Sequence, residues 1–173
     1  NELDKAVAEY SKMIEKFPNS KNIRSAKLKQ GLAYYNMSED EKALSILKKV
    51  VEDYPGTQES KDALKNIRNI YVDNNNVDEF FNYVKQIPTA TVSSSEQDSL
   101  TFKVVENRFL DNDCEKAKKG AIDYIEKFPQ GYFILKAHYY KAECEYKSGN
   151  LVAALESYET LLQKFPKSNY EER

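Results

Sequence analysis

Proline spacing is the feature of this sequence that most constrains its fold. Four of the five prolines stand at positions 18, 55, 129 and 166, so the gaps between them are 37, 74 and 37 residues. An aromatic residue precedes each of the four, and the segment IEKFP occurs twice, at 14–18 and at 125–129. A fixed period of this length is typical of a chain built from repeated supersecondary units.

Apolar residues keep fixed distances from these prolines. The residues twelve, eight and five positions before them are Ala6, Tyr10 and Met13; Ala43, Leu47 and Val50; Ala117, Ala121 and Tyr124; and Ala154, Tyr158 and Leu161. Such positions share one face of a helix, so each unit is predicted to end in an amphipathic helix. The small alanine would let a neighbouring helix approach closely.

Helix boundaries follow from turn and stop signals. Proline ends a helix because it lacks an N–H and disfavours the α conformation before it. Polar turns at 74–76, 111–113 and 148–150 mark other ends, with Gly149 as a C-cap. Ser38 and Glu41 are predicted to form a capping box, and polar links such as 19–20 and 167–168 to cap the helices that follow. The sequence thus predicts an all-α protein with nine helices, at about 2–17, 21–36, 39–54, 58–73, 77–87, 95–111, 114–128, 131–148 and 151–165.

The third unit departs from the period. Position 92 is a valine, and Pro88 comes four residues early, followed by a polar link at 89–95. Phe80 or Phe81 stands where the other units have alanine. We interpret the chain as one array with a locally loosened joint, either a hinge or a fixed kink, in preference to two unrelated domains.

The pattern resembles the tetratricopeptide repeat. The second unit carries Gly31, Tyr34, Ala43, Leu47 and Pro55 at the positions of that motif. The last unit carries Ala142, Gly149, Ala154, Tyr158 and Pro166; the first has Ala6, Tyr10 and Pro18; the fourth has Ala117 and Pro129, with Ala121 where a large residue is usual. The resemblance implies a right-handed α-solenoid of antiparallel helix pairs. It divides the chain into 1–19 (the second helix of repeat 1), 20–56 (repeat 2), 57–94 (a degenerate repeat 3), 95–130 (repeat 4), 131–167 (repeat 5) and 168–173 (the start of a further helix).

The 37-residue period and the Phe-Pro-x-Ser ends are similar to the repeats of bacterial cell-envelope proteins. Examples are the outer-membrane assembly lipoprotein and the periplasmic cell-division coordinator. The resemblance favours the periplasm or cell envelope over the cytoplasm. Because the chain opens on Asn1, we expect it to be a piece of a longer protein.

Composition and motif content argue against several functions. The net charge of −2 disfavours a nucleic-acid partner, and no apolar run approaches the ~20 residues that span a bilayer. The single histidine, His138, is predicted to pack in the helical core. Cys114 and Cys144 lie equally far from Pro129 and would sit at similar heights on antiparallel helices; we expect two free, half-buried thiols in preference to a disulfide. No catalytic, metal or cofactor motif is present, so we predict a protein that is not an enzyme and needs no cofactor.

The resemblance implies that the first helix of each pair lines a concave binding face. The predicted face residues are Leu28, Leu32, Tyr35, Asn36, Lys65, Asn69, Val72, Asp73, Phe102, Glu106, Phe109, Leu110, Tyr139, Glu143, Tyr146 and Lys147. The simplest alternative is that half of these side chains pack inside the array and do not face a partner. The predicted function is a non-catalytic scaffold that binds a peptide or partner protein. Two alternatives stay open: a spacer in a long envelope protein that self-associates through exposed terminal helices, and an accessory domain whose active part lies elsewhere.

Overall fold

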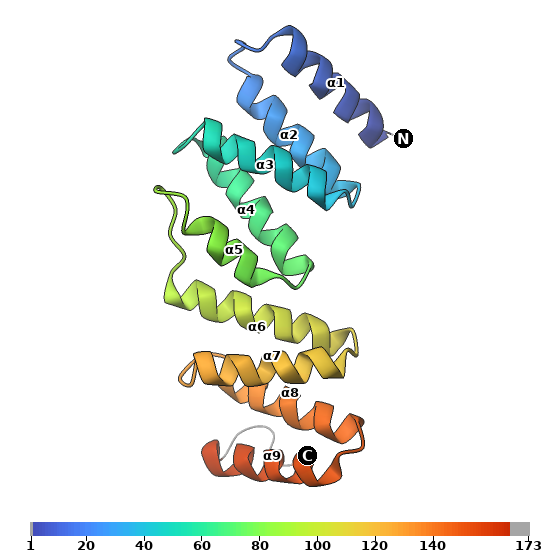
Figure 1. Cartoon of the computed structure of the whole chain (residues 1–173), viewed down its shortest axis with the longest axis vertical. Coiled ribbons are helices and arrows are strands. Elements are labelled where there is room, and N and C mark those ends of the chain that lie inside the picture. The colour runs from blue at the N-terminus through green and yellow to red at the C-terminus, as the bar shows by residue number, and fades with distance from the viewer. Residues whose placement is uncertain (1, 167–173) are drawn as a thin grey trace. The chain divides into compact units, whose positions relative to one another are not determined.

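Helices and the turns that join them make up the described part of the chain, as the computed structural model of residues 2–166 shows (Figure 1). No strand occurs among these residues, so the all-α prediction is confirmed. Nine helices lie within 2–166: α1 (Glu2–Lys16), α2 (Ile23–Asn36), α3 (Asp40–Asp53), α4 (Gln58–Asp73), α5 (Val77–Val84), α6 (Ser94–Leu110), α7 (Cys114–Lys127), α8 (Ile134–Lys147) and α9 (Leu151–Lys164). The helix start predicted at 168–173 lies outside the described residues.

Contacts divide the chain into two compact units. Unit 1 comprises 1–74 and 78–91, and unit 2 comprises 75–77 and 92–173. The main division, between Thr91 and Val92, falls inside the polar link where the sequence period is interrupted. Each unit is described by itself below.

In unit 1, α1 packs against α2, α2 against α3 and α3 against α4, and α2 also packs against α4. The predicted stripe on α3 is fully buried, with Ala43, Leu47 and Val50 inaccessible to solvent. A Cβ atom added at Gly31 would lie only 2.7 Å from Leu47 Cδ2. Glycine at this position therefore permits the close approach of α2 to α3.

Unit 2 repeats this arrangement with α6 to α9, and α6 also packs against α8. Ala117 and Ala154 are buried at their helix crossings, as the repeat pattern predicts. A central cluster joins the three helices α6, α7 and α8. Its buried members are Phe102, Val105, Ala121, Tyr124 and Ala137.

Several predicted helix ends are confirmed. The Asn150 and Asp113 side chains accept from the backbone N–H groups of Ala153 and Lys116 and so cap α9 and α7. Gly149 follows the end of α8 with a φ of +78°, the left-handed conformation that suits a glycine C-cap. The asparagine turn at 74–76 also separates α4 from α5 as expected.

The predicted capping box at Ser38 is wrong. Ser38 has a φ of +58°, and its N–H donates to the Tyr35 carbonyl, while the Glu39 N–H donates back to Tyr34. Ser38 therefore terminates α2 instead of starting α3, whose N-cap is Glu39 without a side-chain cap. The same short polar stretch can serve either role, and the backbone conformation decides between them.

Three helices are shorter than predicted by two or three residues at one end. α2 begins at Ile23 after Asn22, and Ser20 accepts from the Asn22 N–H without capping the helix. α8 begins at Ile134, three residues later than expected. α5 ends at Val84, where turn bonds such as Gln86 N–H to the Tyr83 carbonyl replace the helical pattern before Pro88. The predicted link 167–168 lies outside the described residues.

Candidate functional site

The surface predicted to bind a partner is carried by α2 and α4 in unit 1. Leu28 on α2 and Val72 on α4 are buried, so their prediction as face residues is wrong: both side chains belong to the packing of the unit. Leu32, Tyr35 and Asn69 are half-buried, whereas Asn36, Lys65 and Asp73 are exposed. The exposed part of this surface is thus mainly polar.

Tyr35 is already engaged within unit 1. Its hydroxyl donates a short hydrogen bond to Asp73 Oδ2, which joins α2 to α4. Partial burial and this acidic partner raise the pKa of Tyr35 to about 12, because both disfavour a phenolate. The ring therefore acts as a bridge between helices as well as a surface group.

In unit 2 the prediction that Phe102 faces a partner is wrong. The side chain is only 2% exposed because it fills the core between α7 and the start of α8. Its ring stacks on Phe133 with centroids 4.7 Å apart, and it meets Tyr124 edge-on at 5.4 Å. Replacing Phe102 would therefore test the stability of the unit and not its binding surface.

Phe102 begins a column of rings that leads to the surface. Tyr140 stacks against Phe102 at 5.7 Å and against Phe109 at 4.0 Å, with interplanar angles of 14° and 11°. The Lys147 ammonium lies 4.5 Å from the Phe109 centroid and completes the column with a cation–π contact. We call Phe133, Phe102, Tyr140 and Phe109 the aromatic column. The sequence prediction missed Tyr140, which only the pairing of α6 with α8 brings between the other rings.

Charged and aromatic side chains surround the outer end of this column. Glu106 on α6 pairs with Lys103 at 2.9 Å and with Lys136 on α8 at 3.8 Å. Tyr139, Glu143 and Tyr146 follow one stripe of α8, at spacings of four and three residues. Tyr146 is 59% exposed. We call the surface made by Glu106, Phe109, Tyr139, Glu143, Tyr146 and Lys147 the α6–α8 platform.

Glu143 is fixed by a neighbouring helix. Its Oε1 accepts a 2.6 Å hydrogen bond from the Tyr158 hydroxyl of α9. Burial and this carboxylate raise the pKa of Tyr158 well above its usual range. The stripe on α8 is therefore held in place from both sides, by α9 at Glu143 and by α6 through the aromatic column.

Comparison with known families agrees with this helix pairing. A family model described as the tetratricopeptide repeat matches residues 25–57 and 136–168. These segments correspond to the helix pairs α2–α3 and α8–α9. The chain therefore contains tetratricopeptide repeats. A search of curated proteins found none with a significant match.

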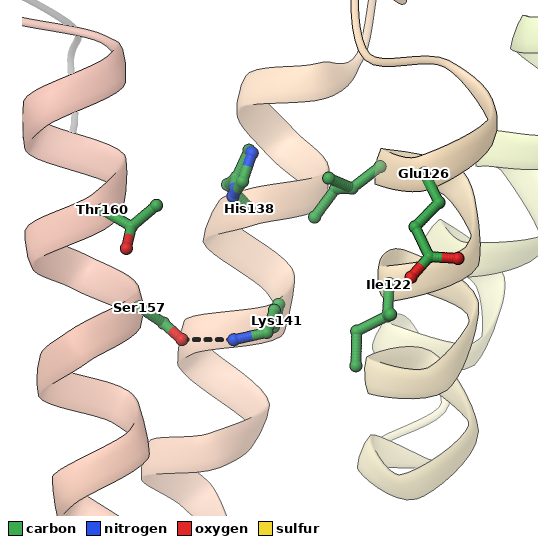
Figure 2. Close-up of a pocket in the computed structure, with 7 residues that line it drawn as sticks. Ile122, Glu126, His138, Lys141, Ser157 and Thr160 are labelled. Atoms are coloured by element: carbon green, nitrogen blue, oxygen red, sulfur yellow. Dashed lines mark hydrogen bonds between the residues drawn. The ribbon is translucent and has the colours of Figure 1, made fainter.

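A second candidate site in this repeat protein is a cavity of about 220 Å³ formed by α7, α8 and α9 (Figure 2). Lys141 and Ser157 face each other across it, and the Lys141 ammonium donates to Ser157 Oγ at 2.5 Å (Figure 2). Ser157 Oγ in turn donates to Glu145 Oε2, while Lys141 pairs with Glu145 Oε1 at 3.0 Å. The other lining residues are Ile122, Ile125, Glu126, His138 and Thr160.

The chemistry of this cavity favours structure over catalysis. A serine beside a lysine can act as a nucleophile only if the amine is neutral and takes the proton. Here the Glu145 carboxylate stabilises the charged ammonium, and Ser157 already donates its hydrogen to that carboxylate. His138 is buried as predicted; burial and the positive charges of Lys164 and Lys141 lower its pKa and keep it neutral. These contacts satisfy buried polar groups between α8 and α9.

Within residues 2–166, no group of three His, Cys, Asp or Glu side chains could hold a metal ion. None of the described helices is long and apolar enough to cross a membrane.

Proposed function

We propose that this chain is a non-catalytic scaffold that binds a peptide segment of a partner protein on the α6–α8 platform. Tetratricopeptide repeats generally mediate protein–protein interaction and serve as scaffolds without catalytic activity. The platform lies on the first helices of the fourth and fifth predicted repeats, where the family resemblance expects binding. The alternation of packed and exposed aromatic residues supports this choice within unit 2.

The aromatic column is the observation that carries the proposal. It is anchored in the core at Phe102 and ends at the half-buried Phe109. Packing already fixes the rings of the column. The scaffold therefore loses little conformational entropy when a partner side chain binds against Phe109. Tyr146 adds an exposed aromatic group of the kind that dominates binding energy in protein interfaces.

Charges on the platform and beside it suggest the chemistry of the partner. Glu106 and Glu143 alternate with Lys103, Lys136 and Lys147 on neighbouring turns of α6 and α8. Such mixed charges favour a segment with one apolar anchor flanked by charged residues of both signs, because every charge then finds a complementary group. An unbroken acidic or basic segment would meet repulsion at some of these positions.

The test selects peptides from a random displayed library against the immobilised full chain and measures their dissociation constants by fluorescence anisotropy. Tyr146→Ser should weaken binding at least tenfold, as expected when an interface loses an aromatic anchor worth about 2 kcal/mol. Tyr132→Ser is the matched control, because Tyr132 is 88% exposed and lies outside the platform, in the turn before α8. Circular dichroism checks that both variants keep their helicity.

Two outcomes would contradict the proposal. One is the absence of peptides that bind above the level of an unrelated helical protein. The other is equal affinity of the selected peptides for wild type, Tyr146→Ser and Tyr132→Ser, which would place binding elsewhere on the chain.

Self-association is the second candidate function, favoured by the outer face of α9. Leu151, Val152 and Leu155 are each at least 60% exposed there, and Leu162 continues the same side of the helix. A second copy that covers this face would give a mass that rises with concentration in light scattering, and Leu155→Lys would abolish the rise. A constant monomer mass for the wild type would exclude this candidate.

A further inference from the structure

Two cysteines meet at the open end of the α7–α8 hairpin. The helices run antiparallel on either side of the turn after Pro129, and Ala121 and Ala137 are fully buried where they cross. Cys114 lies seven residues before Ala121, and Cys144 lies seven residues after Ala137. Seven residues are close to two helical turns, so each cysteine lies on the same face as its alanine, facing the partner helix.

The two thiols are free and in direct contact. Cys144 is only 1% exposed, whereas Cys114 is half-buried. Cys114 lies close enough to contribute to the raised pKa of Cys144, so the pairing of α7 with α8 already brings the two side chains together. Both belong to regular helix, at the first residue of α7 and in the last turn of α8, which fixes the geometry of the pair.

We propose that Cys114 is a site of thiol–disulfide exchange with small disulfides such as oxidised glutathione, and that Cys144 is its resolving thiol. Cys114 Sγ, as the thiolate, attacks one sulfur of the small disulfide, forms a mixed disulfide and releases one small thiol. Cys144 Sγ then attacks Cys114 Sγ, forms the Cys114–Cys144 disulfide and releases the second small thiol. Two protein thiols lose two electrons in total, and the small disulfide gains them together with the two protons.

The exposure of each thiol sets the order of these steps. A dissolved disulfide can reach the half-buried Cys114 but not the buried Cys144. Burial, followed by the contact with Cys114, raises the pKa of Cys144 to about 12. Resolution is therefore expected to be the slower step, and it should accelerate as the pH rises because the thiolate fraction of Cys144 grows.

The disulfide would staple the open end of the hairpin. It closes a loop of about 30 residues, which restricts the unfolded chain most strongly in unit 2. The melting temperature should rise by about 10 °C on oxidation and return to its reduced value with dithiothreitol. This inference does not depend on the function proposed above.

The experiment incubates the reduced full chain with oxidised glutathione and follows its intact mass with time. The expected product has lost two hydrogens, has no thiol that iodoacetamide can alkylate, and gives one linked peptide pair containing Cys114 and Cys144. Cys144→Ala should stop at the glutathione adduct on Cys114. Cys114→Ser should stay unmodified under native conditions and react only in denaturant, where Cys144 is accessible.

Three results would overturn the inference. The wild type could stop at the same glutathione adduct as Cys144→Ala. It could form disulfide-linked dimers in place of the internal bond, or the internal bond could form only in denaturant. Far-UV circular dichroism of the reduced variants confirms that each is folded before oxidation.

Discussion

The chain turns sharply after Pro55 and again after Pro129, and the next helix starts in a different way at each turn. After Pro55, Thr57 caps α4 itself: its hydroxyl oxygen accepts from the Ser60 N–H and donates to the Tyr54 carbonyl. After Pro129, Phe133 precedes α8 without a side-chain cap. There the N–H groups of Tyr132 and Phe133 donate to Asp98 on α6 and to the Tyr124 hydroxyl on α7.

This difference separates local from tertiary control of a helix start. The Thr57 cap needs only partners within three residues of itself, whereas Asp98 lies 34 residues before the N–H that it accepts from. Tyr124 stands five residues before its proline, the same position as Val50 in unit 1, where the buried side chain is apolar. One repeat position thus holds either an apolar core residue or the centre of a buried hydrogen-bond network formed by Tyr124 and Asp98.

The largest expected effect comes from removing Tyr124. Tyr124→Ala should lower the free energy of unfolding by about 4 kcal/mol or more, because it opens a core cavity and leaves the buried Asp98 carboxylate short of a donor. Thr57→Ala removes only a local cap and should cost about 1 kcal/mol. Urea denaturation measures both, and hydrogen exchange should place the first loss in α6–α8 and the second at the start of α4. Equal losses of unfolding free energy in the two variants would contradict the distinction between local and tertiary control.

Glycine substitutions at the two turns should give an intermediate effect. A Cβ at Gly131 would overlap the Tyr124 hydroxyl and lie 2.8 Å from Phe128 Cβ and 3.0 Å from the Phe128 carbonyl oxygen. Gly131→Ala should therefore cost about 2 to 3 kcal/mol through crowding. Gly56 has a φ of +78° and open space around it, so Gly56→Ala should cost only about 1 kcal/mol of backbone strain. Thermal melts of both variants provide the test. A larger loss of stability for Gly56→Ala than for Gly131→Ala would contradict the prediction.

The smallest expected effect is a loss of stability at acidic pH, which should arise in unit 2. His138 is the one histidine of the sequence, and its folded pKa is lowered from the model-compound value of 6.5, first by burial and then by Lys164 and Lys141. The unfolded chain therefore binds the proton more readily, so stability should fall as the pH drops through 6.5. Nuclear magnetic resonance titration of the imidazole should give a pKa below 6.5, and Lys164→Ala should move it upward. A titration at or above 6.5 in the wild type would contradict the assignment.

The two turns also explain what the sequence could predict. The sequence predicts the start of α4 to the residue. It also marks the boundaries before α7 and α9 by the polar turns at 111–113 and 148–150, because Asp113 and Asn150 act within three residues. It predicts the start of α8 three residues early because the partners of that start come from α6 and α7, and no local pattern reports them. At Ser38 a local pattern existed but fitted two motifs, and only the backbone conformation distinguishes them.

The candidate site follows the same rule. Helix phase correctly indicated that Tyr146 is exposed, since that depends on α8 alone. It failed at Phe102 and Leu28, whose burial depends on side chains from other helices, and it missed Tyr140 for the same reason. Periodicity within one helix cannot report what a neighbouring helix covers. The binding role of Glu106, Phe109, Tyr139, Glu143 and Tyr146 remains a prediction.

The network at Asp98 and Tyr124 has a consequence for the exchange of repeats between proteins. A segment cut from the chain at Gly131 would leave both acceptors of the Tyr132 and Phe133 N–H groups behind on α6 and α7. A segment cut at Thr57 would carry its own cap with it. The segment from α6 to α9 therefore forms one transplantable block, and recombination between α7 and α8 would have to preserve an aspartate and a tyrosine in the preceding helix pair.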